Sequence, residues 1–122
     1  MTRRAAFLLL FWAALALAVT MALLPRPPVT PIDRFGDKFQ HMLAFATMTG
    51  LATVAFPRAP LLRIGERLSF LGALIEVCQS IPALGRDCDI RDWIADTLAI
   101  AVVLLLATAL RRRLSSGSAR PT

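Results

Sequence analysis

The sequence predicts an all-α fold: a single bundle of four transmembrane helices over residues 1–122, with both termini in the cytoplasm. Three observations support this prediction. Of the 122 residues, 57% are apolar and 18% charged, which is more apolar than a soluble domain of this size. The charged residues occur in short clusters between long apolar runs. Arginines flank those runs, as they do at the ends of segments that cross a bilayer.

The first expected helix covers residues 5–24. About twenty apolar residues at a rise of about 1.5 Å cover the hydrocarbon core of a bilayer. Arg3 and Arg4 precede the run and Pro25 follows it. A secretory signal peptide begins in the same way. This run is long for a signal peptide and no small-x-small cleavage site precedes the prolines, so we interpret it as a retained helix.

The second expected helix covers residues 38–56 and follows a proline-rich connection. Asp37 suits its start, because a carboxylate there accepts hydrogen bonds from free backbone N–H groups. Pro57 and Pro60 end it, since proline cannot continue a helix.

The third expected helix covers residues 66–81 and contains two polar side chains, Glu76 and Gln79. We expect both to face other helices rather than lipid. Pro82 ends this helix.

The fourth expected helix covers residues 92–110 and ends at the three arginines of residues 111–113. Residues 114–122 are small or polar, so we expect them to form a disordered tail. Arginine and lysine are more frequent on the side that carries both termini, which predicts an in–out–in–out–in topology. Together with the arginine- and alanine-rich composition, this predicts a multi-pass protein of a bacterial inner membrane.

Polar side chains gather near the outer ends of three expected helices. Asp37 and His41 are four residues apart, and so are Asp92 and Asp96, so each pair shares a helix face. A charged side chain at the centre of a membrane helix costs about 2.5–3.5 kcal/mol, so such residues are rare without a role. We predict that His41, Glu76 and Asp92 are the candidate acid–base residues. The candidate substrate-binding residues are Asp37, Lys38, Gln79, Arg86, Arg91 and Asp96.

Several kinds of chemistry lack a sequence signal. There is no HxxxH or CxxC spacing, no serine nucleophile motif and no glycine-rich phosphate loop, so we predict neither a metal site nor a cofactor. The net charge of +6 forms no basic face with interleaved aromatic residues, which argues against nucleic acid as a partner. Cys78 and Cys88 match no disulfide framework, and both a disulfide and two free thiols stay open.

Two motifs resemble those of VanZ-like membrane proteins. The run Asp37-Lys-Phe-Gln-His41-Met-Leu-Ala-Phe45 resembles the DKxxHxxxF signature of that family. Glu76-x-x-Gln79, followed by Arg86 and Asp92, resembles its ExxQ…R…D pattern. The resemblance covers residues 37–100, although Asp96 stands where family members often have asparagine. It implies a short integral membrane protein, and it implies a link to antibiotic resistance because the namesake lowers susceptibility to teicoplanin.

Three hypotheses of function follow. In the first, the protein binds or acts on the anionic headgroup of a membrane lipid or lipid-linked envelope precursor, which Lys38, Arg86 and Arg91 would hold. In the second, it is a structural or accessory membrane protein whose polar cluster only locks helix packing. In the third, it is a small ion or solute carrier, which would have to form a homo-oligomer.

Overall fold

The computed structural model describes residues 2–24, 36–85 and 88–118, and its regular secondary structure there is all helical. Four long helices are present: α1 (Arg3–Leu23), α2 (Asp37–Ala55), α3 (Leu61–Gln79) and α4 (Ile90–Ser118). A short 3-10 helix, η2 (Pro82–Leu84), follows α3. The all-helical part of the predicted fold class therefore agrees with the structure.

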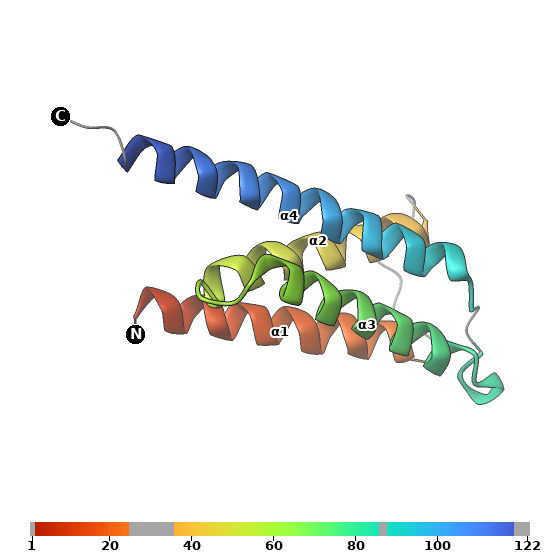
Figure 1. Ribbon diagram of the computed structural model, residues 1–122. Helices are drawn as coiled ribbons and strands as arrows, with labels where there is room; N and C mark the ends of the chain where they lie inside the picture. Colours follow the sequence, from red (N-terminus) through yellow and green to blue (C-terminus); the bar gives the residue numbers. More distant parts are fainter. Residues whose placement is uncertain (1, 25–35, 86–87, 119–122) are drawn as a thin grey trace.

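The four helices run up and down, and α2 and α3 lie between α1 and α4 (Figure 1). α4 packs on both α2 and α3, whereas α1 packs mainly on α2. Both ends of the chain lie at the same end of the bundle (Figure 1). The opposite end therefore brings together the end of α1, the start of α2, the end of α3 and the start of α4.

The prediction of four membrane-spanning helices is wrong. Among the described helices, only α1 and α4 are long and apolar enough to cross a membrane. α2 and α3 each have 19 residues, but side chains such as Lys38, Glu66 and Glu76 lower their hydropathy. The in–out–in–out–in topology of four crossings fails for the same reason. An apolar run with flanking arginines is not by itself a membrane span, because it also has to exclude charged residues.

Two helix boundaries also differ from the prediction. α3 begins at Leu61, directly after Pro60, so the charged segment before residue 68 is helical. α4 continues past the three arginines to Ser118, so the expectation of disorder is wrong for residues 114–118, while residues 119–122 lie outside the described residues. Arginine is a good helix former, and Arg111 Nη2 donates a hydrogen bond to the Thr53 carbonyl at 3.2 Å, which holds α4 against α2.

The core of the bundle is small and apolar. Its buried residues are Phe11, Phe45, Met48, Ala52, Ala55, Ile64, Leu68, Ile75 and Ile100. Phe11 of α1 packs edge-on against Phe56, with ring centroids 5.4 Å apart. α1 is thus an integral part of the packed bundle.

The outward faces of α1 and α4 carry many large apolar side chains. The exposed ones are Leu9, Leu10, Trp12 and Leu17 on α1, and Ile90, Ile94, Leu98, Val102, Leu105, Leu106, Leu110 and Leu114 on α4. The interior, by contrast, contains the polar side chains of Glu76, Gln79 and Asp96. Soluble monomers rarely expose apolar patches of this extent. Apolar side chains outside and polar ones inside indicate a membrane protein.

Candidate functional site

Four ionisable side chains meet near the end of the bundle that lies opposite the termini. We call them the polar site: His41 from α2, Glu76 from α3, and Asp92 and Asp96 from α4. Ligand-type atoms of His41, Glu76 and Asp92 lie within 4.8 Å of one another. The Nδ1 atom of His41 lies 3.8 Å from Oδ1 of Asp96. The structure therefore brings the three candidate acid–base residues together, and Asp96 lies close to the Nδ1 atom of the histidine.

Asp89 connects two of the helices that form the polar site. It precedes the first residue of α4, and its Oδ1 atom accepts a hydrogen bond from the Arg91 N–H at 2.9 Å, as an N-cap residue does. Its own N–H donates to Oε2 of Glu76 at 3.0 Å. The start of α4 is thus attached to the last turn of α3. Asp89 is not among the predicted site residues, although an aspartate just before an apolar run is a helix-start signal.

A second set of hydrogen bonds joins α3 to α4 deeper in the bundle. Trp93 Nε1 donates to the Ser69 carbonyl at 3.0 Å. The hydroxyl groups of Ser69 and Thr97 lie 2.9 Å apart. Sequence reasoning missed these partners, and the only signal was a hydroxyl residue within each apolar stretch. They fix the rotation of α4, which directs Asp92 and Asp96 toward α2 and α3.

Gly72 allows α4 to approach α3 at the polar site. A Cβ atom at this position would lie 3.4 Å from Asp96 Oδ2, from a ring atom of Phe45 and from a ring atom of Trp93. A larger side chain would therefore compete with Asp96 for space. Because residue 72 has no side chain, the Asp96 carboxylate has room to lie against α3 at this point.

The polar site is electrostatically unfavourable by itself. Glu76 is 6% exposed and Asp96 is 1% exposed. Within the described residues, Nδ1 of His41, Oε1 of Glu76 and Oδ1 of Asp96 are buried without a hydrogen-bond partner. Each such atom costs about 1–3 kcal/mol. Two negative charges at the 4.8 Å limit of the cluster repel by about 3–4 kcal/mol at an effective dielectric constant of about 20.

His41 and Glu76 lie on α2 and α3, outside the two candidate spans. The Asp96 carboxylate raises the pKa of His41, while burial opposes the shift. Burial raises the pKa of Glu76, and the hydrogen bond from the Asp89 N–H opposes that shift. Both groups therefore hold a proton more readily than usual, which suits them for proton exchange.

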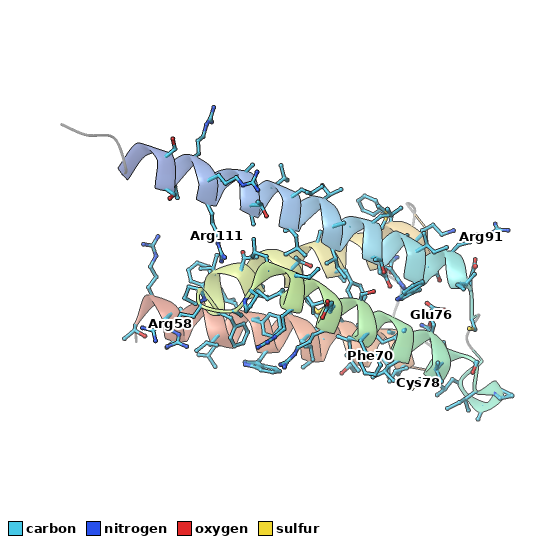
Figure 2. The ribbon with its side chains drawn as sticks, viewed as in Figure 1. Arg58, Phe70, Glu76, Cys78, Arg91 and Arg111 are labelled. Carbon is cyan, nitrogen blue, oxygen red and sulfur yellow. The ribbon has the colours of Figure 1, made fainter. Side chains whose placement is uncertain are left out.

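Of the three predicted cationic residues, the structure describes Lys38 and Arg91, and both are exposed at the start of a helix that contributes to the polar site. Arg91 is exposed and projects from the start of α4, whereas Glu76 lies between α3 and α4 (Figure 2). Lys38 is exposed at the start of α2, and its charge acts on Asp92. Arg86 lies outside the described residues, so its predicted role is not placed. For Asp37 the structure describes the backbone, which begins α2.

Gln79 joins two helices through one end of its amide, and its Oε1 atom is buried without a hydrogen-bond partner among the described residues, so its predicted binding role stays a prediction. Its Nε2 atom donates to the Ala22 carbonyl at 2.9 Å, which attaches the last turn of α3 to the end of α1. Gln79 therefore holds two helices together beside the polar site.

Neither cysteine forms a disulfide: Cys78 is half-buried and Cys88 is exposed, and both are free thiols.

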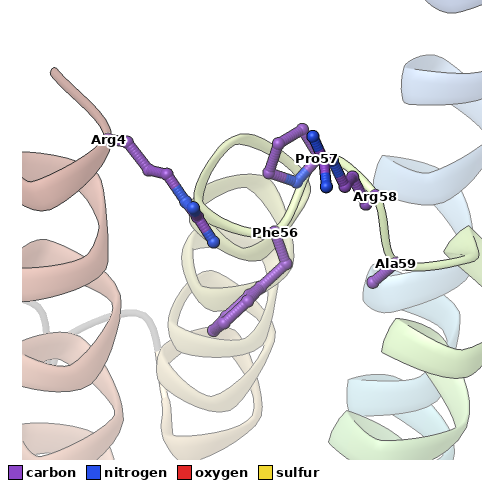
Figure 3. A pocket seen from close by; sticks show the side chains of 5 residues that line it. All are labelled: Arg4, Phe56, Pro57, Arg58 and Ala59. Atoms are coloured by element: carbon purple, nitrogen blue, oxygen red, sulfur yellow. The ribbon is translucent and has the colours of Figure 1, made fainter.

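A cavity of about 400 Å³ lies at the opposite end of the bundle, between the start of α1 and the turn that joins α2 to α3 (Figure 3). The residues that line it are Arg4, Phe56, Pro57, Arg58 and Ala59. Two guanidinium groups suit an anion. This lining contains no carboxylate or histidine, so it offers no acid–base chemistry. The polar site is the stronger candidate.

Comparisons with known proteins found no match among protein families, curated proteins or solved structures. The resemblance to VanZ-like proteins therefore stays a prediction, which rests on the motifs around His41 and Glu76.

Proposed function

We propose that the protein is an integral membrane protein whose polar site binds the polar headgroup of a membrane lipid or lipid-linked envelope precursor. One observation carries the proposal: buried atoms of His41, Glu76 and Asp96 lack hydrogen-bond partners within the described residues. Buried polar groups without partners are rare in folded proteins, and a catalytic role or a bound ion, water or ligand accounts for many of them.

The proposed location is a bacterial inner membrane, which the chain crosses more than once. The exposed apolar side chains of α1 and α4 support membrane insertion. The VanZ-like motifs support an envelope ligand and a link to antibiotic resistance, because the namesake of that family alters susceptibility to an envelope-directed antibiotic.

Each residue of the site has a chemical role in this proposal. Lys38 and Arg91 are exposed at the starts of α2 and α4, and their charges suit the phosphate of a headgroup. The sequence adds Arg86 to them. His41 and Glu76 exchange protons with the bound group, and Asp96 orients the His41 ring from 3.8 Å.

A second candidate function is structural. The hydrogen bonds from Asp89 to Glu76, from Gln79 to Ala22 and from Trp93 to Ser69 each join two segments of the bundle. In this alternative, the polar residues only lock the helices. The atoms without partners argue against it, since a network selected for packing alone would satisfy them.

Native mass spectrometry of the purified protein tests the proposal. We expect the wild type to retain a defined lipid or lipid-linked headgroup and Glu76→Gln to lose it. The substitution keeps an oxygen that can accept from the Asp89 N–H, so helix content by circular dichroism should be unchanged. Glu66→Gln is the matched control, because Glu66 is an exposed carboxylate on the same helix. If the wild type retains no selective ligand and Glu76→Gln only melts at a lower temperature, the structural alternative holds.

A further inference from the structure

The donor atoms of the polar site match those of a metal centre. His41 offers an imidazole nitrogen, and Glu76 and Asp92 each offer a carboxylate oxygen. Ligand atoms on one zinc ion lie about 3.4 Å apart, since each binds at about 2.0–2.1 Å. The three atoms lie within 4.8 Å of one another. Side-chain movements of about 1 Å would therefore bring them to the separations found around one zinc ion.

Asp96 provides a second and independent observation. It is 1% exposed, its Oδ1 atom has no hydrogen-bond partner among the described residues, and this atom lies 3.8 Å from Nδ1 of His41. A histidine that binds a metal usually presents its other ring nitrogen to a carboxylate, which sets the tautomer and orients the ring. Asp96 is placed to do this, and it leaves Nε2 of His41 for the metal.

Charge also favours a cation. The polar site holds three carboxyl groups and one histidine, and Glu76 and Asp96 are almost fully buried. A divalent cation between Glu76 and Asp92 would balance two of the negative charges. It would also supply the partner that Oε1 of Glu76 lacks within the described residues.

We propose that His41, Glu76 and Asp92 bind a divalent transition-metal ion, such as Zn²⁺ or Mn²⁺, with Asp96 as a positioning residue. The imidazole nitrogen favours Zn²⁺ over Mg²⁺ and Ca²⁺, which prefer sites made of oxygen atoms, and the two carboxylates also suit Mn²⁺. Three protein ligands leave at least one position open for a phosphate or a water. Metal binding does not require the proposed headgroup ligand, so this inference goes beyond the proposed function.

Metal analysis of the full-length protein tests the site. The protein in detergent is stripped with a chelator, incubated with Zn²⁺ or Mn²⁺, desalted and assayed by inductively coupled plasma mass spectrometry. We expect about one ion per chain in the wild type and in Glu66→Gln, and none in Glu76→Gln or Asp92→Asn. We expect Asp96→Asn to weaken the affinity by about 10–100-fold. Visible absorption of Co²⁺ bound at the same site provides a second readout, which should lose its intensity in His41→Ala.

Three results would overturn the metal proposal. The first is a wild type that binds no more metal than a protein-free detergent sample. The second is a folded Glu76→Gln that binds as much as the wild type. The third is loss of binding in Cys88→Ser alone, which would place the ion on the exposed thiol. If Glu76→Gln fails to fold, Asp92→Asn and Asp96→Asn decide the same question. Metal binding without a retained lipid would reject only the headgroup proposal, and a retained lipid without metal binding would reject only the metal proposal.

Discussion

Asp96 is the most deeply buried charged side chain among the described residues, with 1% of its surface exposed. Burial of a carboxylate is costly unless a nearby positive charge or donor compensates it. His41 is such a group, but its Nδ1 atom lies 3.8 Å from Oδ1 of Asp96, which is too far for a direct hydrogen bond. The arrangement is therefore incompletely satisfied, and we interpret it as a site built for a ligand rather than for stability.

At the same scale, Asp89 should contribute measurably to stability. Asp89→Ala removes the side chain that accepts from the Arg91 N–H, which should cost about 1 kcal/mol. It keeps the backbone N–H that donates to Glu76, so the polar site should stay assembled. Thermal unfolding in detergent measures the loss, and Asp89→Asn, which preserves a capping oxygen, should unfold close to the wild type. Equal unfolding temperatures for all three proteins would show that this cap does not stabilise α4.

At the scale of the elements, the contact between α3 and α4 determines the position of the polar site. Gly72 permits the close approach, and the hydrogen bonds of Ser69 to Trp93 and Thr97 set the rotation of α4. The register of two helices depends on such contacts along their whole length. A change at a single contact residue should therefore change the position of the Asp96 side chain.

Gly72→Leu tests this contact. The larger side chain has no free space beside Asp96, Phe45 and Trp93, so we expect a destabilisation of about 1–3 kcal/mol. Gly50→Leu is the matched control, because a Cβ atom at Gly50 has no described atom within 4 Å. Leucine favours a helix over glycine by about 1 kcal/mol, so Gly50→Leu should be neutral or stabilising. Equal effects of the two substitutions on the unfolding temperature would contradict the close packing at Gly72.

At the scale of the whole molecule, the distribution of polarity is the reverse of that in a soluble protein. α1 and α4, the two helices with a segment apolar enough to cross a membrane, lie on opposite sides of α2 and α3 and expose large apolar side chains (Figure 1). α2 and α3 also expose large apolar side chains, such as Leu43 and Phe70. Such a surface would associate in water. In a bilayer, the same side chains contact lipid.

Accessibility to a membrane-impermeant thiol reagent tests this arrangement. If α1 and α4 cross the membrane antiparallel, single cysteines from Arg3→Cys and Ser116→Cys should be labelled from the same side. The native Cys88 is exposed and lies just before α4, so it should be labelled from the other side. The single-cysteine proteins carry Cys78→Ser, and Cys88→Ser where needed. Labelling of residues 3 and 116 from opposite sides would contradict the antiparallel arrangement, and release of the protein by alkaline carbonate would contradict membrane insertion.

The sequence by itself determined the all-helical class and the residues that could form a site. Long apolar runs, prolines at their ends and polar pairs four residues apart are local signals, and a helix is a local structure. The spacing of Asp92 and Asp96 therefore predicted a shared face. Membrane crossing was overestimated, because charged residues such as Glu66 and Glu76 leave α3 without a segment that is apolar enough to cross a membrane.

Only the tertiary structure decided which of the candidates meet. Residues 41, 76 and 92 belong to three helices, and their mutual distance depends on helix order and rotation, which no periodicity encodes. For this reason, the sequence offered no metal-type spacing, yet the structure places an imidazole and two carboxylates within 4.8 Å. The same packing places the Nε2 atom of Gln79 against the backbone of α1, a contact that no spacing in the sequence predicts. Helix formation follows from neighbours in the chain, whereas a site between helices follows from packing.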